Sequence, residues 1–199
     1  MSIKISAFIL IILTLITITG LRLFSQDKKY SFVGSQACAK CHGTDAIGNQ
    51  YNIWKGSPHS KAFATLRTSD AKKIAAKAGI ESPETNYECL KCHNTGAGKF
   101  KEAYSEGVGC EACHGPASAY IDYENHVSLT DRKSGYKKAM SNGMYPILGI
   151  EGIKFRERLC LHCHNEKRAC YPESIEDRKK QKIGLEAISE FIYKHPVRK

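Results

Sequence analysis

The sequence lacks any sustained alternation of apolar and polar residues, and it has fewer acidic than basic residues. Without that alternation the chain has no pattern for a β-sheet, so we expect helices and loops. Aspartate and glutamate total 20 against 30 lysines and arginines, which gives a formal net charge of +10. With only eight histidines in 199 residues, few metal ions can be bound by imidazole side chains.

Four of the eight histidines directly follow a pair of cysteines. The motif Cys-x-x-Cys-His is the c-type haem attachment pattern, in which both thiols bond to one porphyrin and the histidine binds its iron. The sequence therefore predicts four covalently bound haems c. The predicted attachment residues are Cys38, Cys41, Cys89, Cys92, Cys110, Cys113, Cys160 and Cys163, and the predicted proximal ligands are His42, His93, His114 and His164.

Structural zinc is the alternative for two of these motifs. The pairs Cys89/Cys92 and Cys110/Cys113 are separated as in a zinc ribbon. Zinc does not explain why a histidine follows every pair, whereas haem explains both features. A ninth cysteine, Cys170, belongs to no motif, and we expect it to be a free thiol.

Each haem iron also has a sixth coordination position. Of the remaining histidines, we expect His59, His126 and His195 to be distal ligands, and we expect His162, inside a motif, to point to solvent or to a haem propionate. Three distal histidines for four irons predict one five-coordinate iron, where a small diatomic molecule would bind.

The coarse pattern predicts a mostly α, compact tetrahaem fold with extensive loops, in which haems form much of the core. One helix is predicted from Ser57, as the N-cap, to Gly79, and it carries His59 on an apolar face. A second helix begins near Pro172 and carries His195 before Pro196. The glycine-containing polar stretches 43–50, 95–100 and 131–152 are predicted loops.

The N-terminus predicts export from the cytoplasm. An apolar run covers residues 5–21, preceded by Lys4 and followed by Arg22. We therefore expect residues 1–25 to be a signal peptide or an N-terminal membrane anchor, and residues 26–199 to form the tetrahaem cytochrome domain. The expected location is the periplasm, with the protein secreted across the inner membrane or anchored to it.

The positive charge does not indicate a nucleic-acid partner. Each haem adds about one negative charge when oxidised and about two when reduced, so bound haems offset most of the basic excess. We expect the lysines to balance propionates and to offer a docking face to acidic redox proteins.

The motifs also suggest an internal duplication. Cys38–Gly43 and Cys110–Gly115 both end in glycine, whereas Cys89–Asn94 and Cys160–Asn165 share a leucine and end in asparagine. This alternation pairs the first motif with the third and the second with the fourth.

Three segments resemble the tetrahaem cytochrome c-554 (c-554/c-prime) family. They are Val33-Gly34-Ser35 before the first motif, Trp54-x-x-Ser57-Pro58-His59, and the run from Gly107 to Pro116 around the third motif. The resemblance implies haems in close pairs, three irons with two histidines and one open iron at the second motif, with His59 as a distal ligand. It also implies electron transfer from hydroxylamine oxidoreductase in nitrifiers. Where relatives often have histidine, this chain has Tyr120, with His126 six residues later.

These observations predict a periplasmic carrier of single electrons between redox proteins. Two alternatives remain open. One is a reductase of nitric oxide or another nitrogen oxide at the five-coordinate haem, and the other is a membrane-anchored relay that takes electrons from quinol. The reductase lacks an obvious proton donor in the stretch 94–98 that follows the second motif.

Overall fold

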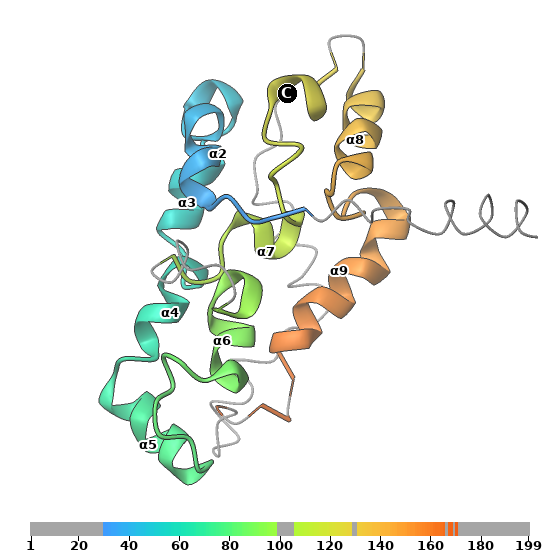
Figure 1. Ribbon diagram of the computed structural model, residues 1–199. Coiled ribbons are helices and arrows are strands. Elements are labelled where there is room, and N and C mark those ends of the chain that lie inside the picture. Colours follow the sequence, from blue (N-terminus) through green and yellow to red (C-terminus); the bar gives the residue numbers. More distant parts are fainter. Residues whose placement is uncertain (1–29, 99–105, 129–130, 166, 169, 171–199) are drawn as a thin grey trace, which may run out of the picture.

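The computed structural model in Figure 1 describes residues 30–98, 106–128, 131–165, 167–168 and 170. Every regular element within these ranges is helical, which confirms the mostly α fold with extensive loops. The predictions for residues 1–25 and for the helix that carries His195 lie outside the described residues. In the part of the chain that the structure describes, no helix is both long and apolar enough to cross a membrane.

The helices form three columns in Figure 1. Helices α2 to α5 follow one side, α7 and α6 lie in the middle, and α8 and α9 lie on the other side. Helix α2 contacts α7, and α6 contacts both α4 and α9, so the middle column joins the two sides. The α-helices are α2 (Ser35–His42), α3 (Gln50–Lys55), α4 (Ala62–Thr65), α5 (Ser69–Lys77), α6 (Tyr87–His93), α7 (Cys110–His114), α8 (Arg132–Ser141) and α9 (Gly149–Cys163). The short 3-10 helices are η1 (Asp45–Ile47), η2 (His59–Lys61), η3 (Thr95–Gly98) and η5 (Tyr123–Asn125).

The helix predicted from Ser57 to Gly79 is interrupted. It consists of η2, α4 and α5, with a break before Ser69. The Thr68 hydroxyl accepts a hydrogen bond from the amide of Ala71 at 3.2 Å and so caps a new helix, α5. Ser57 is not a cap, since its buried hydroxyl oxygen contacts no hydrogen-bonding group among the described residues. The predicted stop is confirmed, because α5 ends at Lys77, just before Gly79.

The prediction of a loop over 131–152 was wrong. This stretch contains all of α8 and the first turn of α9. The carboxylate of Asp131 starts α8 by accepting hydrogen bonds from the amide and the hydroxyl of Ser134, both at 2.7 Å. A strong N-cap therefore outweighs the glycine and the polar composition that favoured a loop.

Buried apolar side chains form two small clusters. Phe63, Leu66 and Leu90 join α4 to α6 and pack against Cys89. The second cluster lies around α8 and the segment after α7, and it consists of Ala117, Tyr120 and Ala139, packed against Val33, Ile121 and Met144. Both clusters lie close to Cys-x-x-Cys-His motifs, and the prediction that haems complete the core remains to be tested.

Candidate haem-binding site

All four motifs occupy the C-terminal ends of helices. Helices α2, α6 and α7 end at the motif histidine, and α9 ends at Cys163, one residue before His164. In a helix, residues at positions i, i+3 and i+4 share one face, so each helix presents two thiols and one imidazole together. This is the arrangement that attachment of one haem requires.

Hydrogen bonds hold two of the predicted proximal histidines by the same nitrogen. His42 Nδ1 lies 3.3 Å from the side-chain oxygen of Gln50. His93 Nδ1 lies 2.8 Å from the carbonyl oxygen of Ala62 and 3.2 Å from the hydroxyl of Thr65. A histidine that binds a metal through Nε2 usually donates its Nδ1 proton to such an acceptor, which fixes the ring. Both rings are therefore prepared to bind iron through Nε2.

His59 lies next to the predicted proximal ligand of the fourth motif. The ring centres of His59 and His164 are 5.9 Å apart. Two imidazoles that bind one metal from opposite sides, each at about 2.0–2.1 Å, have ring centres about 6 Å apart. Burial lowers the pKa of His59, and burial, with His59 and Arg168 nearby, lowers the pKa of His164 to about 4. Both rings are neutral at pH 7, the form that binds metals.

The other candidate distal ligands lie elsewhere. The ring centre of His126 is 6.3 Å from that of Tyr123, and its Nδ1 lies 3.0 Å from the carbonyl oxygen of Asp122. His162 is exposed, as expected for a residue that does not bind iron. His195 lies outside the described residues. The ligand roles of these histidines stay predictions.

Attachment thiols of different motifs lie close together in two pairs. Cys38 of the first motif shares a hydrogen bond with Cys110 of the third, which raises the pKa of Cys38 and lowers that of Cys110. Cys92 of the second motif shares one with Cys163 of the fourth, which lowers the pKa of Cys92 to about 6 and raises that of Cys163. Each pair therefore brings two motifs side by side.

The structure does not assemble the zinc array. Among the described side chains, no three cysteine, histidine, aspartate or glutamate residues gather into a set that would hold one metal ion. Cys170 lies beside His93 and shares a hydrogen bond with it, which raises the pKa of His93 and lowers that of the thiol.

Glu111 holds the third motif in place, and sequence reasoning missed it. Its side chain is 1% exposed, and its carboxylate accepts hydrogen bonds from the amides of Val33 at 3.0 Å, Gly34 at 2.7 Å and Ala117 at 2.7 Å. Tyr120 donates its hydroxyl to the carbonyl oxygen of Gly115 at 2.6 Å. The motif is thus tied to the chain on both sides.

Gly107 sets the position of His59. It has φ +72°, and a Cβ there would lie 2.5 Å from the carbonyl oxygen of His59 and 2.8 Å from that of Ser60. Because the next amide, of Val108, donates to the same His59 oxygen at 2.9 Å, the two segments are held together at this point.

We therefore expect Gly107→Ala to lower the free energy of unfolding by about 3 kcal/mol, through overpacking and left-handed strain. Gly79→Ala is the matched control, since Gly79 has φ +71° but nothing within 4 Å of its Cβ position, and it should cost about 1 to 2 kcal/mol. Denaturant titration of both variants measures the difference. Equal losses would show that the close contact with His59 carries no energy.

The residues present fit haem c. The thiols and imidazoles occur in four matched sets, and α9 places a buried guanidinium nitrogen of Arg156 without a hydrogen-bond partner among the described residues, as a haem carboxylate would require. The family described as cytochrome c554 and c-prime matches residues 37–115, which include the first three motifs. Over this segment the chain is similar to that family, and its motifs are those of covalent haem c attachment.

Two relatives extend the comparison. Cytochrome c-554 of Nitrosomonas europaea is 29% identical over 168 residues, which cover 78% of this chain and 66% of the relative. The cbb3-type cytochrome c oxidase subunit CcoP of Rubrivivax gelatinosus is 27% identical over 138 residues, which cover 59% of this chain and 45% of that subunit. The chain thus spans less than two thirds of the length of either relative. No solved structure matches the chain significantly.

Proposed function

We propose that this protein is a periplasmic tetrahaem c-type cytochrome that carries single electrons between redox proteins. The observation that carries the proposal is the placement of four complete motifs, each at the end of its own helix. Haem supplies an iron that gains and loses one electron. The relationship to cytochrome c-554 of Nitrosomonas europaea supports the electron-transfer role.

The protein's contribution is to attach, orient and space the four groups. The thiol pairs join the first motif to the third and the second to the fourth. Burial, with the Cys160 thiol nearby, raises the pKa of Cys113 in the third motif to about 11. The hydrogen bond with Cys92 and burial raise the pKa of Cys163, and the nearby Cys113 thiol adds to that rise. The attachment points therefore form one unbroken series in the order first, third, fourth and second motif. Such a series supports electron passage from one end of the chain of sites to the other.

The axial ligands of the irons can be assigned from the positions of the histidines. We assign His59 and His164 to one iron, at the fourth motif, because of their 5.9 Å separation. His126 and His195 then remain for the other three motifs, so one of these irons lacks a distal histidine. The family resemblance favours the second motif, with His93, as the open one. A reductase at that iron is the second candidate function, and this shortage of ligands is the observation that favours it.

The mass of the denatured protein tests the proposal. When the protein is produced with a c-type maturation system, we expect the mass of the full chain to increase by four covalent haems. Replacing both cysteines of one motif by alanine should remove one haem and leave three. Fewer than four haems in the unaltered protein, or zinc in place of iron in elemental analysis, would contradict the assignment.

A further inference from the structure

We propose that Arg156 binds a haem propionate where the third and fourth motifs meet, and that its charge raises the reduction potential of that haem. This inference rests on the proposed attachment of haem at these two motifs.

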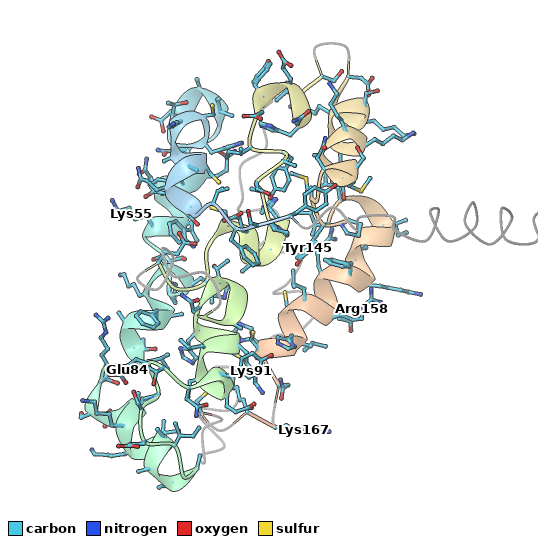
Figure 2. All side chains as sticks on the ribbon, viewed as in Figure 1. Lys55, Glu84, Lys91, Tyr145, Arg158 and Lys167 are labelled. Atoms are coloured by element: carbon cyan, nitrogen blue, oxygen red, sulfur yellow. The ribbon has the colours of Figure 1, made fainter. Side chains whose placement is uncertain are left out.

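Arg156 lies between the two motifs. On α9 it precedes Cys160 by four residues, so both side chains share one face, and the guanidinium opposes the rise in the pKa of the Cys160 thiol. Its Nη1 donates a hydrogen bond to the carbonyl oxygen of Ile147. The same segment reaches the third motif, because the amide of Tyr145 donates to the carbonyl oxygen of His114 at 2.9 Å. Figure 2 shows Tyr145 between α7, which carries the third motif, and α9.

The guanidinium of Arg156 is fixed by its hydrogen bond to Ile147 but has no carboxylate partner among the described residues. Its Nε is buried and has no hydrogen-bond partner among the described residues, and no described carboxylate forms an ion pair with it. Arg156 as a whole is only partly buried, but its Nε–H is a buried donor without an acceptor, which destabilises a fold. An acceptor on a bound group, and most strongly an anion, would complete this site.

A carboxylate is the anion that fits. Two parallel donors of a guanidinium match the two oxygens of a carboxylate, and each haem c brings two propionates to its site. Gly152 lets this part of α9 lie close to Ile147, since a Cβ there would lie 2.5 Å from the carbonyl carbon of Ile147 and 3.1 Å from Arg156 Nη1. The absence of a side chain at Gly152 thus leaves room for the guanidinium of Arg156 beside Ile147.

A positive charge beside a haem stabilises its ferrous form relative to its ferric form, because reduction removes one positive charge from the iron. Removal of the charge should therefore lower the reduction potential of the haem in contact. At the separation of a propionate from its iron, we expect the equilibrium at that haem to shift about tenfold toward the ferric form.

The test is a redox titration of holoprotein whose four haems have been confirmed by mass. Arg156→Gln should lower one midpoint potential and leave the other three in place, and Arg156→Lys, which keeps the charge, should restore most of the loss. Arg158→Gln is the matched control. Arg158 lies on the same helix but is exposed, with its guanidinium 5.9 Å from the ring centre of Phe155, and Figure 2 shows it pointing away from the other helices. It should leave all four potentials unchanged.

Titration followed by electron paramagnetic resonance identifies whether the third or the fourth haem supplies the propionate. Unchanged potentials in a four-haem Arg156→Gln protein would overturn the inference alone, as would equal shifts in the glutamine and lysine variants. A haem missing from the third or fourth motif of the unaltered protein would instead overturn the proposed function and this inference together.

Discussion

Replacing Glu111 by glutamine should lower the free energy of unfolding by about 3 kcal/mol while all four attachment motifs stay intact. The Glu111 carboxylate accepts hydrogen bonds from three backbone amides, of Val33, Gly34 and Ala117. Each of its two oxygens faces at least one of these amides. Whichever way a glutamine amide is turned, its NH₂ group faces a backbone N–H at close range.

The size of the effect follows from burial. A buried donor left without an acceptor costs about 1 to 3 kcal/mol, and bonds to a carboxylate are stronger than bonds to an amide. Glu111 is 1% exposed, so water does not replace the lost acceptor. We expect Glu111→Ala to cost more than Glu111→Gln, since it leaves all three amides unpaired and adds a cavity.

Glu88→Gln is the control. Glu88 lies next to Cys89 in the second motif, but its side chain is 59% exposed and its partner is the ammonium of Lys91 on the same helix. Loss of this surface pair should change stability by about 0.5 kcal/mol or less. Denaturant titration of the holoproteins, followed by circular dichroism, compares the variants. Similar midpoints for Glu111→Gln and Glu88→Gln would show that the buried network does not stabilise the fold.

Local sequence was sufficient for the attachment motifs. A motif of five consecutive residues contains all of its own chemistry, whereas the position of each motif at the end of a helix was not predicted. The absence of alternating apolar residues also predicted the helical class. These features depend on neighbours in the chain, which a single sequence displays directly.

Contacts between distant residues could not be predicted in this way. Glu111 looks like an ordinary variable position within a motif, and only the fold shows that Val33 and Gly34 reach it from far along the chain. The apolar face that carries His59 suggested a ligand, but nothing in the sequence identified His164 as the residue next to it. Side-chain caps also set the starts of two helices, at Thr68 and at Asp131, that the sequence pattern did not locate.

Replacement of His59 is the second change for which we expect a large effect, here on the spin state of one haem. We expect His59→Ala to convert one low-spin haem to a high-spin haem without loss of covalent haem, because the variant removes a sixth ligand and leaves the thiols untouched. The burial of His59 lowers its pKa, so the ring is neutral and does not have to lose a proton before it binds iron. His59→Met should keep that iron six-coordinate and raise its reduction potential, since a thioether favours the ferrous state more than an imidazole does.

Electron paramagnetic resonance of the ferric proteins measures the change. His162→Ala is the control, because His162 is exposed within the fourth motif, and its removal should leave the spectrum unchanged. Imidazole added to His59→Ala should restore the low-spin signal by occupying the vacated position, which a variant that had merely lost packing would not allow. The fourth haem should be the one affected, because the ring centre of His59 lies 5.9 Å from that of His164. An unchanged spectrum in a folded, four-haem His59→Ala protein would return His59 to a packing role and would free His126 or His162 to bind the fourth iron.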